Sequence, residues 1–148
     1  MPISSEKNQP LDNSSALDNS SDSCSDHSQA FQRGIDEFNS GQFYACHDTL
    51  EAIWMAVDHA EKPFYQGILQ IAVAFYHLGN LNWRGGAILL GEGLSRLGRF
   101  EPNYQGVNVE TLVDQSVEWL EWVQVAGEEG LAALMADKKR SCPQIQKI

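Results

Sequence analysis

Apolar residues recur at helical spacing from residue 28 onward. Phe31, Ile35 and Phe38 stand at i, i+4 and i+7, the spacing that places side chains on one face of an α-helix. Ser28 is available as an N-cap, and the run Asn39-Ser40-Gly41 is typical of a helix end followed by a turn. The pattern therefore predicts a first helix from residue 28 to about residue 39.

The segment from about Gln42 to Val57 predicts a second helix, apolar over most of its circumference. At about 100° per residue, its large side chains fall in one stripe and its alanines lie nearly opposite. We therefore expect this helix to lie at the centre of the fold, with no face left free to solvent. The stripe consists of Phe43, His47, Leu50, Trp54 and Val57, and the alanines are Ala45, Ala52 and Ala56.

Two more helices are predicted on either side of a turn at Gly79-Asn80. Pro63 suits the first turn of a third helix, residues 63 to about 78, because its missing N–H would have no partner there. Asn82 can cap a fourth helix, residues 83 to about 97. Each glycine inside that helix costs about 1 kcal/mol relative to alanine, so we expect another backbone or a ligand to approach closely. These glycines are Gly85, Gly86, Gly91 and Gly93.

The last third of the chain predicts a loop, a long helix and a tail. Residues 98–106 are rich in turn formers and long enough to cross a bundle. Asn108 can cap a fifth helix, residues 109 to about 124. After Gly127 we expect a short helix over residues 131–137, and then an extended tail, residues 143–148, in which Ile145 and Ile148 can dock on the bundle.

Taken together, these elements predict an all-α protein. We expect a single compact bundle of about five main helices, built from antiparallel helical hairpins and spanning residues 28–125. Residues 126–148 form the C-terminal short helix and extended tail. Residues 1–27 hold eight serines, five acidic residues and one lysine, a composition that predicts a disordered leader because it offers little apolar surface to bury.

Composition and charge narrow the classes of partner. The 148 residues are 43% hydrophobic, enough for one core, and their net charge is −10. An acidic chain lacks the basic footprint that binds phosphate backbones or anionic lipid, so we expect neither nucleic acid nor a membrane as partner. The basic run Lys138-Lys139-Arg140 is short and predicts a solvated tail.

The cysteines and the N-terminus indicate a cytoplasmic, soluble protein. Cys24, Cys46 and Cys142 have no zinc-like spacing, and an odd, sparse set indicates reduced thiols, with Cys46 in the core. The first residues show no basic region followed by an apolar one, as a secretory signal would. The uncharged stretch between Lys62 and Arg84 is interrupted by polar residues and predicts a core helix, not a membrane span.

The candidate chemistry lies on the second helix. His47 and Glu51 stand one turn apart on a mostly apolar helix, where an unpaired polar group would cost about 1–3 kcal/mol. If the second and third helices form an antiparallel hairpin turning near Ala60, Gln70 lies midway between these two residues, and Gln66 lies one turn away. The same register places Trp54 opposite Tyr65.

Three interpretations of this cluster stay open. In the first, His47, Glu51 and Gln70 satisfy one another's hydrogen bonds in a structural core network. In the second, they form a small-ligand pocket, with Trp54 and Tyr65 as an aromatic wall and Gln66 at its edge.

The third interpretation is a metal-assisted or general acid/base enzyme, hydrolase-like, using His47 and Glu51. A catalytic metal needs a third ligand. Asp48 points about 100° away from His47 around the helix, and His77 lies about a turn too far along the axis. The sequence identifies no cofactor and does not fix an oligomeric state. It favours a module that binds a small molecule or interacts with a protein partner, with the enzyme as the alternative.

The same residues carry a family likeness. The segment 38–54, with His47, Glu51 and Trp54 as a His-x-x-x-Glu-x-x-Trp motif, resembles the signature of the domain of unknown function 309 family, small all-helical bacterial and archaeal proteins. Segments 64–72 and 82–87 are similar to its later blocks, so the likeness covers roughly residues 28–125. The resemblance implies a helical bundle with the three motif residues as functional candidates, and it supplies no reaction.

Overall fold

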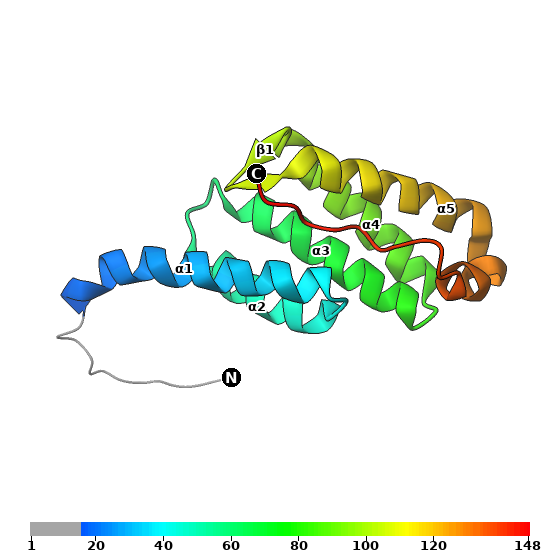
Figure 1. Cartoon of the computed structure of the whole chain (residues 1–148), viewed down its shortest axis with the longest axis horizontal. Helices are drawn as coiled ribbons and strands as arrows, with labels where there is room; N and C mark the ends of the chain where they lie inside the picture. Colours follow the sequence, from blue (N-terminus) through cyan, green and yellow to red (C-terminus); the bar gives the residue numbers. More distant parts are fainter. Residues whose placement is uncertain (1–15) are drawn as a thin grey trace.

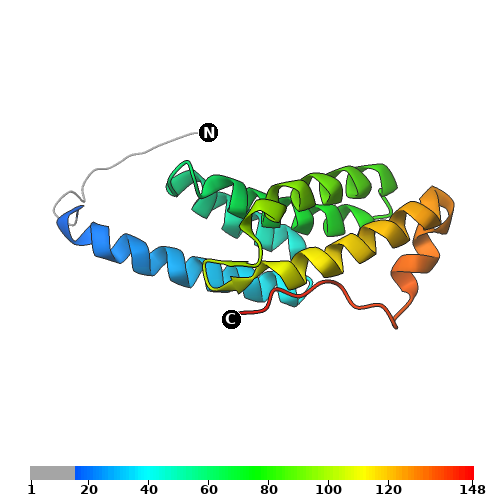
Figure 2. The same ribbon diagram turned by 90° about the horizontal axis from the view of Figure 1, so that it is seen from above.

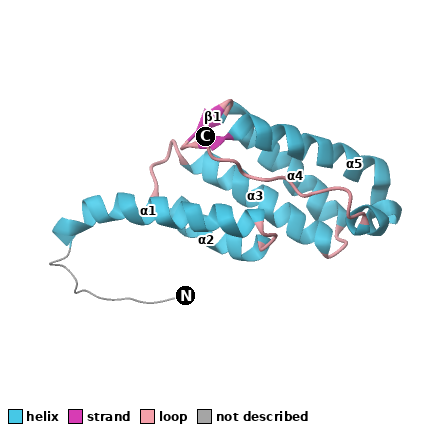
Figure 3. Cartoon of the chain, viewed as in Figure 1, coloured by secondary structure: helices cyan, strands magenta, loops and turns pink. Residues whose placement is uncertain are grey.

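The described part of the chain forms five α-helices that pack in sequence order (Figure 1). A computed structural model describes the backbone of residues 16–148 and the side chains of residues 27–148. Within that part of the chain, each helix packs chiefly on the helices before and after it. Helices make up most of the fold, and the strands are confined to one short pair (Figure 3). The predicted all-α bundle is confirmed.

The first helix, α1 (Ala16–Asn39), begins well before the predicted start at Ser28. The boundary of the leader at residue 27 is therefore wrong for residues 16–27, and residues 1–15 lie outside the described residues. Residues 16–27 contain neither glycine nor proline. Once the packed turns around Phe31 and Ile35 are formed, each further turn adds hydrogen bonds without a new nucleation cost, which overrides weak helix propensity.

Helix α2 (Phe43–Ala56) has nearly the predicted bounds, but it does not lie at the centre. It packs on α1 and α3, and its buried residues are Cys46, Thr49, Leu50 and Ile53. The opposite face is open to solvent, so the prediction of a helix with no free face is wrong. An apolar side chain does not have to be buried, and the pattern alone does not say how many neighbours a helix has.

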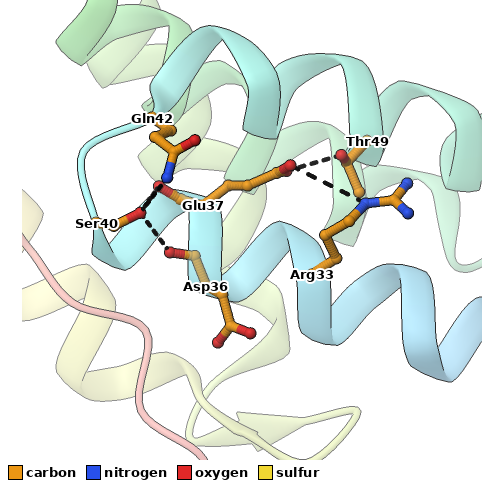
Figure 4. Close-up of polar contacts among 6 residues, drawn as sticks. All are labelled: Arg33, Asp36, Glu37, Ser40, Gln42 and Thr49. Atoms are coloured by element: carbon orange, nitrogen blue, oxygen red, sulfur yellow. Dashed lines mark hydrogen bonds and ion pairs between the residues drawn. The ribbon is translucent and has the colours of Figure 1, made fainter.

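Polar contacts fix the hairpin between α1 and α2 (Figure 4). The Thr49 hydroxyl, on a nearly buried side chain, donates to Glu37 Oε1 at 2.7 Å, and Arg33 Nε lies 4.0 Å from Glu37 Oε2. At the turn, Gln42 Nε2 donates to Ser40 Oγ at 2.9 Å. One hydrogen bond thus joins the two helices and another lies within the turn, in addition to the packing of the apolar stripes.

Helices α3 (Lys62–Gly79) and α4 (Trp83–Leu97) form the closest pair of the bundle. Asn82 caps α4 as predicted, accepting from the Gly85 amide at 3.1 Å. At Gly93 and Gly67 the two helices approach so closely that an added Cβ atom would lie within 3.0 Å of atoms in the other helix. The close approach expected at the glycines of α4 is found at Gly86 and Gly93, where an added Cβ atom would meet α3.

A short 3₁₀ helix, η3 (Gly98–Phe100), leads into an antiparallel pair of strands, β1 (Asn103–Tyr104) and β2 (Val107–Asn108). The loop expected at residues 98–106 therefore contains a small hairpin. Helix α5 (Val109–Ala136) follows and is longer than predicted. Gly127, at φ +67°, kinks it at the position where the sequence indicated a break between two helices.

The C-terminal tail runs back along the bundle from the end of α5 to the β-hairpin (Figures 1 and 2). The Asn39 side chain bonds both backbone groups of Ile145, accepting from its amide at 2.7 Å and donating to its carbonyl at 3.0 Å. Ile145 is buried, as expected, whereas the side chain of Ile148 is 74% exposed and does not dock.

No helix of the described residues has the length and apolarity needed to cross a membrane. The cytoplasmic location inferred from the sequence stays a prediction. The core runs through all five helices and the tail, and its largest fully buried side chains include Phe38, Phe64, Phe75, Leu90, Leu112 and Leu131.

Candidate functional site

His47 and Glu51 lie at the surface of α2, not inside the bundle. The His47 side chain is 22% exposed, Asp48 is 66% exposed, and Glu51 is exposed. The predicted buried polar cluster is therefore wrong. Since α2 has neighbours on one side only, residues expected on an inner face instead border the solvent, where water satisfies them.

Asp48 joins His47 and Glu51, contrary to the expectation that it points away. The His47 Nδ1 atom lies 3.2 Å from Asp48 Oδ1. One ligand atom from each of the three residues lies within 4.8 Å of the other two. The angular separation along the helix applies to Cβ positions, whereas exposed side chains swing through a wider arc. Sequence spacing therefore missed the third member of the cluster.

An aromatic residue holds the imidazole in place. The ring of Tyr44 stacks on His47 with centroids 5.3 Å apart and planes 30° from parallel, and it also contacts the ring of Tyr76 on α3 at 5.1 Å. Sequence reasoning missed Tyr44, although its i, i+3 spacing to His47 predicts contact on a helix.

A groove of about 160 Å³ lies beside this cluster, between α2 and α3. Its lining consists of Glu51, Trp54, Gln66 and Leu69, so the structure brings together three of the residues expected to bind a ligand. The Trp54 ring is half-buried and lies 4.4 Å from Lys62 Nζ, which donates to the Trp54 carbonyl oxygen. Among the described residues, the buried indole Nε1 of Trp54 has no hydrogen-bond partner.

Gln70 does not converge with His47 and Glu51, so this part of the predicted site is wrong. Its amide nitrogen donates to Glu92 Oε1 at 3.2 Å, and its amide oxygen accepts from Arg96 Nη1 at 3.1 Å. Both partners are on α4. The hairpin register gave the height of Gln70 along α3, but α3 has a neighbour on each side and the register does not say which of them Gln70 faces.

Tyr65 does not form an aromatic wall with Trp54. Its side chain is 5% exposed and packs edge-on against Phe31 at 5.2 Å and Phe64 at 5.1 Å. Burial, followed by the charge of Glu61, raises the pKa of Tyr65 to about 12. The phenol is therefore neutral at physiological pH, and it lines a separate cavity at the other flank of α3.

The cluster on α2 offers one imidazole nitrogen and two carboxylates from a single turn of helix. Such a mixed donor set suits borderline divalent ions such as Zn²⁺, Mn²⁺ and Fe²⁺. Because all three side chains come from one exposed face, water or a second ligand has access to the rest of a coordination sphere.

Comparison with known proteins covers the segment that carries this site. The family model described as domain of unknown function (DUF309) matches residues 31–89. An uncharacterised protein of Aquifex aeolicus (strain VF5) is 29% identical over 73 residues, which is 49% of this chain and 22% of that relative. The chain thus spans about a fifth of the length of the curated relative. No solved structure matches.

Proposed function

We propose that α2 binds a divalent transition-metal ion. The helix lies within residues 31–89, which match the family model described as domain of unknown function (DUF309), and that description assigns no reaction. The observation that carries the proposal is the grouping of His47, Asp48 and Glu51, whose ligand atoms lie within 4.8 Å of one another. Two ligands of one ion, each about 2.1 Å from it, stand at most about 4.2 Å apart. Small rotations of exposed carboxylates are enough to close that difference.

The donor set favours particular ions. Calcium and magnesium take oxygen ligands, whereas imidazole suits zinc, iron and other transition metals. Stacking on Tyr44 restricts the His47 ring in the free protein, so binding a metal ion costs less conformational entropy at this side chain.

The neighbouring groove supports a small ligand as part of the same function. Glu51 belongs both to the cluster and to the lining of the groove, so a molecule seated there lies next to the ion. Gln66 offers an amide, and Leu69 with the Trp54 ring offers apolar surface. The site as a whole is proposed to bind a metal ion together with a small molecule.

Metal titration by calorimetry tests the proposal, using protein purified without a histidine tag. Zn²⁺ and Mn²⁺ are titrated into the native chain and into the variants His47→Ala and Glu51→Gln. Asp114→Asn, which alters an exposed carboxylate on α5, is the matched control. We expect each site variant to weaken binding by at least about tenfold, with the control unchanged. Equal affinity in all four proteins, or no binding by the native chain, would refute the proposal.

The free face of α2 favours docking of another protein as a second candidate function. Tyr44 and Met55 stand three turns apart on the same stripe and are 54% and 71% exposed. A photo-crosslinking amino acid placed at residue 55, with Val125 (89% exposed) as the control position, tests this in cells. A crosslink at residue 55 and none at residue 125 would favour docking, and none at either position would count against it.

Acid/base catalysis by His47 and Glu51 is the alternative role for the same residues. It requires a substrate in the neighbouring groove and predicts hydrolysis that is lost in Glu51→Gln. If the protein binds metal but turns over no ester, amide or phosphoester probe, the catalytic alternative is refuted and only the binding function stands.

A further inference from the structure

A second, larger cavity lies apart from the α2 cluster, where five segments of the chain meet. Its volume is about 370 Å³, at the small end of the range of about 300–1,000 Å³ that is usual for ligand pockets. Its lining comes from helix α1, the connection from α2 to α3, the first turn of α3, the turn of the β-hairpin and the C-terminal tail. A molecule bound there would contact both the first helix and the C-terminal tail.

The floor of this cavity is apolar but holds one unused polar atom. Phe31 and Tyr65 pack edge-on and are 8% and 5% exposed, and Val57 completes the surface. The Tyr65 hydroxyl has no hydrogen-bond partner among the residues that the structure describes. Because the phenol keeps its proton at neutral pH, it is available as a donor to a guest molecule.

The lining carries one acidic side chain, Glu61, and one basic side chain, Lys147, and it also includes His27 and Ser28 of α1. Glu61 comes from the connection before α3, and Lys147 comes from the tail. Lys147 Nζ donates to Gln32 Oε1 on α1 at 2.7 Å, so the ammonium is held beside the cavity, and its other N–H donors have no partner among the described side chains. Opposite charges on the lining of one cavity with an apolar floor favour a guest that carries both a positive and a negative charge.

The turn of the hairpin adds a backbone observation. Gln105 lines the cavity and has φ +51°, in the left-handed region that L side chains seldom adopt. Together with Gly106 it forms a two-residue hairpin turn, for which asparagine or glycine is the usual first residue. The turn therefore holds a non-glycine residue in a strained backbone conformation at the edge of the cavity.

We propose that this cavity binds a free α-amino acid with an apolar side chain, its ammonium at Glu61, its carboxylate at Lys147 and its side chain on Phe31 and Tyr65. An amine lacking the carboxylate would leave the cationic Lys147 unpaired, and an acid lacking the amine would leave Glu61 unpaired. The zwitterion matches both charges and adds no net charge to the site.

Calorimetric titration with L-leucine and L-phenylalanine tests this assignment in the full chain. Phenethylamine and 3-phenylpropanoate are the matched probes that lack one charge each. We expect the amino acid to bind and each single-charge probe to bind at least tenfold more weakly. The same loss is expected for L-phenylalanine with Glu61→Gln and with Lys147→Met, while Lys138→Met, an exposed lysine outside the cavity, leaves binding unchanged.

Tyr65→Phe separates binding from folding. Since the hydroxyl has no described partner, its removal should leave the thermal midpoint unchanged while weakening amino-acid binding several-fold. Failure of both amino acids to bind at millimolar concentration would overturn the proposal, as would binding that withstands both charge variants. Metal titration reports on a different face, so loss of one proposal does not imply loss of the other.

Discussion

The contact between α3 and α4 predicts opposite outcomes for two glycines of the same helix. A Cβ atom at Gly93 would lie 2.8 Å from the carbonyl oxygen of Gly67, 2.8 Å from Ile71 Cγ1 and 3.2 Å from the Ile71 amide nitrogen. Two of these atoms are backbone, so no side-chain rotation relieves the overlap. At Gly91 a Cβ atom would meet nothing within 4 Å.

The two effects have different magnitudes and signs. Overpacking of a well-packed interface costs about 1–3 kcal/mol, and backbone overlap places Gly93→Ala at the upper end. Alanine gains about 1 kcal/mol over glycine in a helix, which leaves a net loss of about 2 kcal/mol. For Gly91→Ala there is no overlap, and only the gain in helix propensity applies. The free energies of unfolding of the two variants should therefore differ by about 3 kcal/mol.

Urea unfolding followed by circular dichroism at 222 nm measures both variants. We expect the midpoint to fall for Gly93→Ala and to rise for Gly91→Ala, with the slope m unchanged in each. In thermal melts, each kcal/mol of change in the free energy of unfolding shifts the melting temperature by about 2–4 °C for a chain of this size. If Gly93→Ala matched the native chain, or if both alanines shifted stability in the same direction, the close approach of the two backbones would be refuted.

Three further predictions concern the rest of the fold. Asn39→Ala should cost about 1–3 kcal/mol and speed hydrogen exchange at the Ile145 amide, because both of its bonds to the tail are lost; unchanged protection would show that the tail is held without them. Thr49→Val removes the donor to Glu37 and should cost about 1–2 kcal/mol in urea unfolding, whereas a neutral result would mean that Glu37 finds another partner. Burial, followed by the charge of Glu37, raises the pKa of the Cys46 thiol to about 12. Between pH 9 and 12 the unfolded thiol is ionised while the folded thiol keeps its proton. The free energy of unfolding is therefore unaffected by this group below pH 9 and falls between pH 9 and 12 at up to about 1.4 kcal/mol per pH unit. Cys46→Ala should flatten that part of the stability profile, and an identical profile would contradict the burial of the thiol.

Much of the fold could be predicted from local signals. Gly41, Asn82 and Gly127 mark a turn, a cap and a kink, each through backbone geometry that acts within a few residues. Apolar spacing placed α2 within a residue at both ends. The early start of α1 was missed because residues 16–27 have weak helix propensity, and helix extension from a packed segment is not a local property.

The candidate site was predicted less well, for a different reason. Periodicity gives the angle of a side chain around its own helix, but not which angles are covered by neighbours. Glu51 and Gln70 illustrate the two failures. Glu51 lies on a face that none of the described helices covers, and Gln70 faces α4, whereas it was expected to face α2. Trp54 and Gln66 were placed together correctly, because both border the contact between α2 and α3.

The exposure of α2 also changes what mutations of its motif can show. In a buried network, losing Glu51 would leave a partner unsatisfied, and reduced stability would be inseparable from reduced function. At the surface, Glu51→Gln deprives the core of no contact, because the buried stripe of α2 consists of Cys46, Thr49, Leu50 and Ile53. The pattern that suggested a structural core network instead makes the α2 cluster a place where function can be tested with the fold held constant.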